Sequence, residues 1–376
     1  MNKKISILGF VALGLLASCS SDDKISGESI STHIGNSDVE IKLSTGSAAG
    51  TRASIESDEN GVFEAEGLGI FCLAKGSLNI NPKELDIDWT PGTAATEYSV
   101  WMDNVEADAV INEDGLSTDI VWTDGIQRWY PTGNWHSYRF YGYYPRQEEI
   151  KSTDTQRSVD FVIDGTQDII WGKTEVSDDS MAYCAKYFRD PEHKDVTPTI
   201  TFKHKLMRMT FSCVPGTDAD GSIAKSLEMG IESITILSVP TTGNLIIADR
   251  TNPENDGVLT FDWSNNLEDF ELCEADDSPL GEEYWVLEEG TKIGGGILLP
   301  VPEDPAFHYY VNVVLKDKNG NIFQPEHPME IRNGDNFEAG KSYNVKMIIN
   351  GPKVIEVKGT LDAWIEDDAN IGDLEF

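Results

Sequence analysis

The sequence has few cysteines, few histidines and none of the short motifs that mark common active sites. Its 376 residues include five cysteines, with no Cys-x-x-Cys pair, and six scattered histidines. This spacing does not predict a zinc site. The serine-hydrolase, zinc-protease, phosphate-loop and dinucleotide-binding motifs are also missing. We therefore predict that the chain is not an enzyme and has no cofactor and no metal site.

Basic residues are scarce as well. Lys and Arg together number 29 against 65 Asp and Glu, which gives a formal net charge of −36. A polyanion of this size repels nucleic acid, so nucleic acid is not an expected partner. So many carboxylates also make chance pairs of them uninformative about catalysis. The acidic stretches 218–221 and 249–257 lack the Glu that completes an EF-hand loop, and we interpret them as solvated turns.

Long apolar runs are absent apart from one near the start of the chain. Residues 5–17 are mostly apolar and follow Lys3 and Lys4. Because the run is shorter than the roughly 20 residues of a spanning helix, residues 1–18 are predicted to be a signal peptide. The Leu-Ala-Ser-Cys sequence ending at Cys19 matches a lipobox, which predicts cleavage before Cys19 and palmitate-type lipidation of it. The alternative is an ordinary signal peptide followed by a chance cysteine.

The other four cysteines and the nine tryptophans are assigned mainly to the core. Buried thiols are the favoured state of these cysteines, with one or two disulfides as the alternative. Tryptophan buries a large apolar area, so most are expected to pack inside, while one or two exposed ones would suit a glycan or receptor site. Six tryptophans crowd the first half of the chain: Trp89, Trp101, Trp122, Trp129, Trp135 and Trp171.

Sustained helical periodicity is missing, and the body of the chain alternates as strands do. Residues 309–315 alternate and run into an Asn-Gly pair at 319–320 that favours a hairpin turn. Residues 200–206 alternate too, and the phase then flips at 209–213, which indicates a bulge or bend. The one weak helix candidate is 148–151. Further strands are expected at 68–74, 118–122, 137–144, 230–239, 243–248, 296–301, 341–350 and 355–365.

Many short strands with one polar face predict antiparallel β-sandwiches, and thus an all-β fold. The polar loop at 190–198 is the best candidate for a domain boundary. We therefore predict a flexible tether at 19–38, an N-terminal β-sandwich domain at 39–197 and a C-terminal β-sandwich domain at 198–376. His204 lies on an alternating strand and is expected to be a hydrogen-bonded structural residue.

Three stretches together resemble the fimbrillin family, the pilins and pilin-like lipoproteins of the Bacteroidales. Residues 130–145 run from Tyr-Pro into an aromatic strand that ends in Tyr-Tyr-Pro. Residues 200–206 are similar to the family's Phe-x-His-x-Leu strand, and residues 340–364 resemble its closing Gly-Lys-x-Tyr strand and final Trp segment. With the lipobox included, the likeness covers nearly the whole chain.

The resemblance implies two transthyretin-like β-sandwich domains in tandem and assembly by β-strand exchange. Fimbrillin subunits are cut after an arginine in a flexible loop, which frees the first strand so that a strand from the next subunit takes its place. Arg52, followed by Ala53, matches that position within the small-residue stretch 46–53. The removable first strand and its cleavage loop then fall in 39–52, and the strand has three alternating apolar residues: Val39, Ile41 and Leu43.

Two alternatives stay open at the level of sequence. The stretch around Arg52 is alternatively an ordinary surface loop that no protease needs to cut, since some fimbrillins are anchors or tips that keep their first strand. The donor strand is expected at 353–366, where the residues alternate, but the same stretch also suits a permanent strand of the second domain.

The expected location is the surface of the outer membrane, as part of a fimbrium. Residues 20–23, Ser-Ser-Asp-Asp, resemble the acidic export tag of Bacteroidales lipoproteins, and lipid on Cys19 would anchor the chain. The expected partners are other fimbrial subunits, an arginine-specific protease, and a host receptor or glycan bound in adhesion. The rival hypothesis is a monomeric surface glycan-binding lipoprotein.

Overall fold

The computed structural model describes most of the body of the chain. Predictions for the signal peptide, Cys19, Arg52, Ala53, Trp135, Trp364 and the turn at 218–221 lie outside the described residues. The described residues are 33–34, 37–47, 63–75, 87–93, 95–96, 98–113, 115, 117–132, 137–175, 183–216, 228–276, 278–281, 284–304, 306–332, 337–351 and 354–362.

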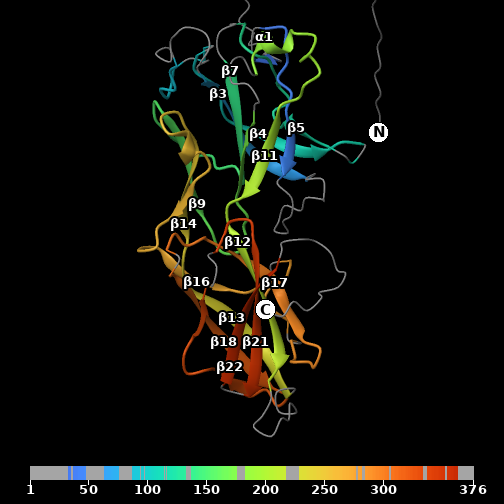
Figure 1. Ribbon diagram of the computed structural model, residues 1–376, viewed down its shortest axis with the longest axis vertical. Coiled ribbons are helices and arrows are strands. Elements are labelled where there is room, and N and C mark those ends of the chain that lie inside the picture. Colours follow the sequence, from blue (N-terminus) through green and yellow to red (C-terminus); the bar gives the residue numbers. More distant parts are fainter. Residues whose placement is uncertain are drawn as a thin grey trace, which may run out of the picture.

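The upper part of the molecule in Figure 1 is a closed barrel of seven strands. Its order is β10-β11-β2-β5-β4-β3-β7, and only the β11–β2 pair is parallel. The central strand β3 is apolar and buried from Leu68 to Ala74 on both faces, as a strand covered on both sides should be. The bounds are β2 Ser44–Ser47, β3 Ala65–Lys75, β4 Val100–Ile111, β5 Thr118–Trp122, β7 Ser137–Tyr144, β10 Ile170–Thr174 and β11 Thr199–His204.

A four-stranded sheet lies beside the barrel at mid-height in Figure 1. It has the order β15-β14-β9-β8, and β9 pairs antiparallel with β14. This pairing joins strands from either side of the predicted boundary between residues 197 and 198. The bounds are β8 Lys151–Ser152, β9 Gln156–Val162, β14 Thr242–Asp249 and β15 Leu259–Phe261.

Trp171 connects the barrel to this middle sheet. Its indole N–H, on β10, donates a hydrogen bond to the Ile247 carbonyl of β14 at 3.0 Å. Gly257 packs so close to the ring that an added Cβ would lie 2.4 Å from it, and its φ of +76° is one that glycine adopts without strain. The indole of this barrel residue therefore fits against the backbone of the middle sheet and of its connecting turn.

Two further sheets form the lower part of the molecule. One has the order β17-β12-β21-β22, and the other β16-β13-β18-β19 with β20 paired to β18. Their buried faces are aliphatic, with Ile234 on β13, Val313 on β18 and Met347 on β21 almost fully enclosed. The bounds are β12 Met207–Pro215, β13 Met229–Pro240, β16 Leu267–Glu271, β17 Thr291–Leu299, β18 His308–Asp317, β19 Ile322–Phe323, β20 Met329–Arg332, β21 Ser342–Gly351 and β22 Val354–Asp362.

The chain passes from the barrel into the lower sheets where the sequence changes phase. Strand β11 ends at His204 and β12 begins at Met207, and β11 pairs within the barrel while β12 pairs with β17 and β21. The predicted bend is confirmed, and a register shift between Met209 and Phe211 adds a bulge. The expected hairpin is present as well, because β18 pairs with β19 across a turn with Gly320 at φ +79°.

Helical structure is sparse in the described residues. Besides the 3-10 turn η3 Pro253–Asn255, they contain the short helix α1 Ala185–Phe188. The helix candidate at 148–151 was wrong, since that stretch leads into β8 without a helical turn. The all-β prediction is confirmed. No helix among the described residues is long and apolar enough to cross a membrane.

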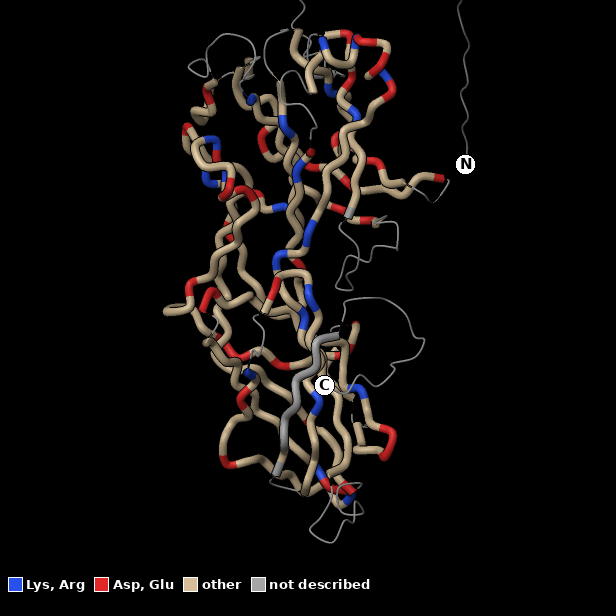
Figure 2. The backbone as a smooth tube through the Cα atoms, viewed as in Figure 1, with Lys and Arg blue, Asp and Glu red and all other residues tan. Residues whose placement is uncertain are grey.

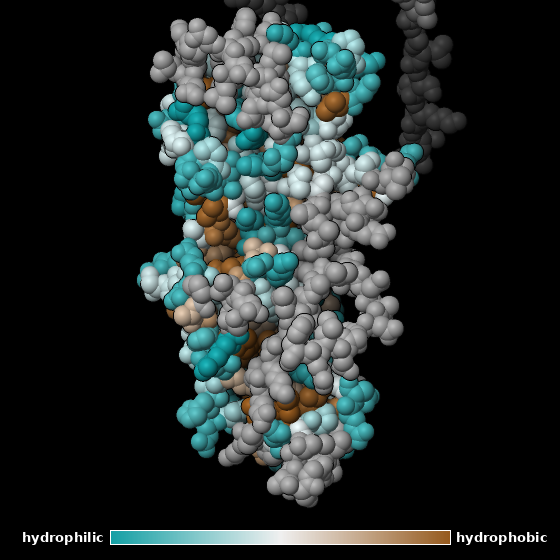
Figure 3. Space-filling view, in the orientation of Figure 1, coloured by the Kyte–Doolittle hydropathy of each residue, from teal (hydrophilic) through white to brown (hydrophobic). Residues whose placement is uncertain are grey.

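The surface is mostly polar and carries scattered acidic charge. Figure 2 shows Asp and Glu distributed over the loops of both parts. On the visible face, apolar side chains come to the surface at the middle of the molecule and again in its lower part (Figure 3).

Candidate functional site

Backbone hydrogen bonds hold residues 37–47 against the barrel. The Tyr130 amide donates to the Val39 carbonyl at 2.9 Å, and the Ile41 amide donates to the Arg128 carbonyl at 2.7 Å. Farther along, the Ile120 amide donates to the Leu43 carbonyl at 2.9 Å. The stretch 19–38 that was predicted to be a flexible tether contains a paired strand, because β1 His33–Ile34 pairs in parallel with β6 Gln127–Arg128.

The side chains of this segment alternate between core and surface. Ile41 is 2% exposed and Leu43 is 1% exposed, while the Lys42 side chain between them is 72% exposed. Val39 is half-buried and packs against the same core. Within residues 37–47, regular strand pairing begins at Ser44, and before it Glu40 forms an isolated bridge with Trp129.

The short strand β2 closes the barrel. It pairs in parallel with β11 on one side, where Ser44 lies opposite Thr199, and antiparallel with β5 on the other, where Ser44 lies opposite Asp119. The Ser44 and Thr199 hydroxyl oxygens are 2.7 Å apart. Without β2 the edges of β5 and β11 would lose their shared neighbour, so this strand occupies a slot between two others.

A groove of about 380 Å³ runs beside residues 40–43 and is lined by β5 on its far side. Next to the lining residue Gln127, Arg128 is 4% exposed and donates to the Asp124 carboxylate at 2.6 Å. That hydrogen bond lowers the pKa of Asp124. The Arg128 guanidinium carbon also lies 4.7 Å from the centre of the Trp122 ring. The first segment therefore has open space along part of one side.

The buried residues outside this slot have structural roles. His204 is nearly buried, and its Nδ1 lies 2.6 Å from Oδ2 of the fully buried Asp168, as expected for a structural histidine. Burial raises the pKa of the Cys72 and Cys184 thiols, and it raises that of Cys213 to about 11. No disulfide joins these three or the half-buried Cys273.

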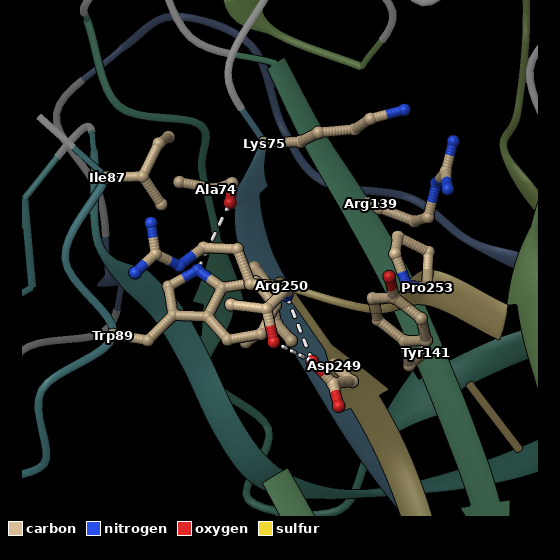
Figure 4. A pocket seen from close by; sticks show the side chains of 11 residues that line it. Ala74, Lys75, Ile87, Trp89, Arg139, Tyr141, Asp249, Arg250 and Pro253 are labelled. Atoms are coloured by element: carbon tan, nitrogen blue, oxygen red, sulfur yellow. Dashed lines mark hydrogen bonds between the residues drawn. The ribbon is translucent and has the colours of Figure 1, made fainter. Parts of the chain in front are cut away.

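The described tryptophans of the first half mostly face the interior. Trp89 and Trp171 are buried, and the half-buried Trp101 donates from its indole N–H to the Trp129 carbonyl at 3.0 Å. Packing and hydrogen bonding therefore account for Trp89, Trp101 and Trp171, and Figure 4 shows the Trp89 indole bonded to the Ala74 carbonyl. Among the described residues, no group of three His, Cys, Asp or Glu side chains is placed to hold a metal ion.

The acidic turn at 249–257 is organised around the Asp249 carboxylate. Its Oδ1 accepts hydrogen bonds from Thr251 and from the Asn252 amide, and its Oδ2 accepts from Gln156 and Asn255. Burial opposes ionisation of this carboxyl, but these hydrogen bonds outweigh it and lower the pKa to about 2. The carboxylate thus ties the turn to β9.

Acid should weaken the turn by protonating Asp249. Because its folded pKa lies below the ordinary value of 3.8, its contribution to stability is complete above about pH 4 and is lost as the pH falls towards about 2. We expect Asp249→Asn to unfold at a lower temperature than the native chain at pH 7, with the gap narrowing between pH 4 and pH 2. Thermal unfolding followed by circular dichroism measures this gap, and a gap constant with pH would contradict the assignment.

Comparison of the sequence with models of protein families identifies the family of this chain. The model described as fimbrillin-like matches residues 51–364, which is most of the chain. No curated protein matches the sequence.

The solved structures that the chain matches have low sequence identity to it. A proposed cell adhesion protein from Bacteroides uniformis is 14% identical, with 87% of this chain and 97% of that chain covered and a TM-score of 0.47. A second from Bacteroides ovatus is 15% identical, with 89% and 100% covered and a TM-score of 0.45. The fimbrial anchor protein Mfa2 from Porphyromonas gingivalis is 9% identical, with 86% and 98% covered and a TM-score of 0.35. On the strength of the family model, the chain belongs to the fimbrillin-like family.

Proposed function

We propose that this protein is a structural subunit of a cell-surface fimbria that acts in adhesion and assembles by β-strand exchange. Membership of the fimbrillin-like family supports a fimbrial-type adhesion protein at the cell surface. The observation that carries the exchange mechanism is the position of residues 37–47, which fill a slot between β5 and β11 and close the barrel.

In the proposed mechanism, an arginine-specific protease cuts between Arg52 and Ala53 and releases the segment that carries Ile41 and Leu43. The vacated slot would expose the unpaired backbone edges of β5 and β11 together with an apolar floor. A strand from another subunit would restore both, because main-chain hydrogen bonds supply the affinity and alternating apolar side chains fix the register.

The donor strand in this proposal is β22 Val354–Asp362. It lies at the edge of its sheet and pairs there with β21. An edge strand leaves one row of backbone groups available and can detach without breaking a second ladder. The alternative, in which β22 stays a permanent strand of the lower sheets, predicts that its ladder with β21 survives assembly.

The remaining parts of the proposal concern architecture and location. We interpret the barrel and the lower sheets as the two transthyretin-like sandwich domains, with their division between His204 and Met207, where the chain leaves the barrel. Lipid on Cys19 would anchor an uncut subunit to the outer membrane surface, and other fimbrial subunits would be its main partners. A host receptor or glycan would be the target of adhesion.

Rebinding of the first segment in trans tests whether the slot is exchangeable. A synthetic peptide of residues 37–47 with a fluorescent label should bind the cleaved chain from which the native segment has been removed, and fluorescence anisotropy should show saturation. A matched peptide with Ile41→Asp and Leu43→Asp should not bind, because its charges would enter the apolar floor. Equal binding of both peptides would disprove the proposed register.

Shortening a side chain of the segment should loosen the barrel by a small, measurable amount. Ile41→Val removes one buried methyl group, and we expect the free energy of unfolding to fall by about 0.5–1.5 kcal/mol. Lys42→Ala should change it by less than about 0.5 kcal/mol, since that side chain faces solvent. Urea unfolding of the two variants measures the difference, and equal midpoints would show that the segment does not pack in the slot in solution.

A further inference from the structure

Residues 127–130 are hydrogen-bonded along both edges by the N-terminal part of the chain. Residues 37–41 run along one edge, where the Ser37 amide donates to the Tyr130 carbonyl at 3.1 Å. Backbone groups of Arg128 and Tyr130 face this edge, and in a strand the groups of alternate residues face opposite edges. The parallel pairing of β1 with β6 therefore uses the other edge. Residues 33–34 and 37–41 together form a clamp around this stretch.

An ion pair fastens the clamp to the residue that follows α1. Arg189 donates from Nε and Nη2 to Oδ1 of Asp38, at 2.9 Å and 2.6 Å. The hydrogen bonds from Arg189 lower the pKa of Asp38. Both side chains reach solvent, so water and salt weaken the attraction between the charges. The pair nevertheless joins the start of the first segment to a part of the barrel that does not leave with it.

The helix α1 holds Arg189 in position at the upper end of the barrel (Figure 1). The Arg189 amide donates to the Ala185 carbonyl at 3.1 Å and so closes the helical turn. The centre of the Phe188 ring lies 5.3 Å from that of Tyr130, the residue whose backbone bonds to the clamp. Because the cation is already in place, forming the ion pair costs less conformational entropy.

The other end of the first segment, β2, is held mainly by its backbone pairing. Its sequence Ser-Thr-Gly-Ser has no large apolar side chain. The Thr45 hydroxyl is buried and has no hydrogen-bond partner among the described residues, which opposes its burial. Gly46 also weakens a strand, because it has no side chain to pack. In the sequence Arg52 follows β2 closely, so a cut there would create a free end beside the weaker half of the segment.

We propose that the clamp keeps the N-terminal half of the first segment in place after cleavage, so that the slot opens from β2 towards Ile41. A strand from a second copy of the chain would then pair first with the edges that β2 leaves, at Asp119 on β5 and Thr199 on β11. It would displace Leu43 and Ile41 next. Release of the clamp comes last and limits the rate of exchange.

This inference rests on the proposed strand exchange and adds its order and its control. Opening of the segment can be measured in a cut chain with no second strand present, so the two ideas can fail separately. A cut chain that never assembles but keeps its clamp would refute exchange alone. A cut chain that assembles although its whole segment opens at once would refute the clamp alone.

Hydrogen exchange followed by mass spectrometry tests the order of opening. The chain is cut with an arginine-specific protease and kept dilute so that it stays monomeric. We expect the cut to speed exchange of the amides of residues 44–47 about tenfold or more, and to change that of residues 37–41 by less than about twofold. Unchanged exchange in residues 44–47, or an equal or larger increase in residues 37–41, would overturn the proposal.

Arg189→Gln tests the fastening of the clamp. In the cut chain it should speed exchange of residues 37–41 about two- to fivefold, the range expected for an exposed ion pair. Arg332→Gln is the matched control, because it also removes an exposed arginine paired with a carboxylate, and it should leave this exchange unchanged.

A charge exchange separates the ion pair from other effects of the substitution. Asp38→Lys combined with Arg189→Asp restores opposite charges without adding an arginine that the protease could cut. Exchange of residues 37–41 should return to within about twofold of the native rate. A native rate in Arg189→Gln, or a double variant that exchanges as fast as Arg189→Gln, would refute the role of the ion pair.

Discussion

Cleavage by an arginine-specific protease should convert the monomeric protein into a ladder of oligomers. Before cleavage, residues 37–47 occupy the slot between β5 and β11 and are joined through residues 48–62 to the next described barrel residue, Phe63. That linkage gives the segment a high effective concentration at its own slot, so a strand from another molecule cannot compete. A cut after Arg52 removes this advantage. Size-exclusion chromatography with light scattering before and after cleavage measures the result.

Buried apolar area explains why cleavage alone need not empty the slot. Ile41 and Leu43 are almost fully enclosed, and each such side chain contributes about 1.5–3 kcal/mol. A cut segment therefore leaves slowly unless another strand offers the same contacts. We expect assembly to depend on protein concentration and to speed up under mild warming, because warming releases the segment more often.

Arg52→Lys is the matched control for this experiment. It keeps the positive charge and most of the side-chain length, but an arginine-specific protease does not cut after lysine. The variant should remain monomeric under the same treatment. Oligomers from Arg52→Lys would assign assembly to another cut, and a native chain that is cut after Arg52 but stays monomeric would rule out a stalk subunit assembled by this route.

Local periodicity predicted the strands well because the alternation of apolar and polar residues lies within each strand. The strands at 118–122 and 137–144 have the expected bounds, and the phase change after Leu206 coincides with the passage from β11 to β12. Burial alternates in 39–43 as the sequence suggests, although regular pairing starts later, at Ser44. A period of two records which face of a strand is buried, and it does not record the partner strand.

Contacts between residues that are far apart in the sequence could not be predicted from local periodicity. The β9–β14 pairing crosses the predicted boundary at 197/198. The sequence of neither strand predicts which strand it pairs with. The clamp has the same property, since Asp38 and Arg189 come together only in the folded chain. Regular pairing before Val39 was missed for a different reason: β1 is two residues long and lies in a stretch rich in Ser, Asp and Gly.

Replacing Arg157 should cause the largest loss of stability of any single substitution considered for this chain. Its side chain is 1% exposed and donates to three carbonyl oxygens, those of Trp89, Thr153 and Gln156. It also forms an ion pair with Asp103 at 3.0 Å. Arg157→Met keeps much of the volume but removes the donor to the Trp89 and Thr153 carbonyls and the charge that pairs with Asp103, and we expect the free energy of unfolding to fall by about 3–5 kcal/mol.

Arg332→Met serves as the control for removing a paired arginine. The Arg332 side chain is 73% exposed and pairs with Glu330 at 2.8 Å, and exposed pairs of this kind contribute little to stability. Guanidinium chloride unfolding of both variants measures the two losses. Similar losses would mean that burial of Arg157 does not stabilise the fold in the way its contacts indicate.

Because of the position of Arg157, we also expect the Arg157→Met substitution to make unfolding less cooperative. Asp103 lies on the barrel strand β4, while Thr153 and Gln156 lie at the turn between β8 and β9 in the middle sheet. One guanidinium therefore joins the barrel to the sheet that continues into the C-terminal half through β14. With this joint intact, the two parts should unfold in one cooperative transition. In Arg157→Met the barrel should melt first, and tryptophan fluorescence and far-ultraviolet circular dichroism should then report different midpoints.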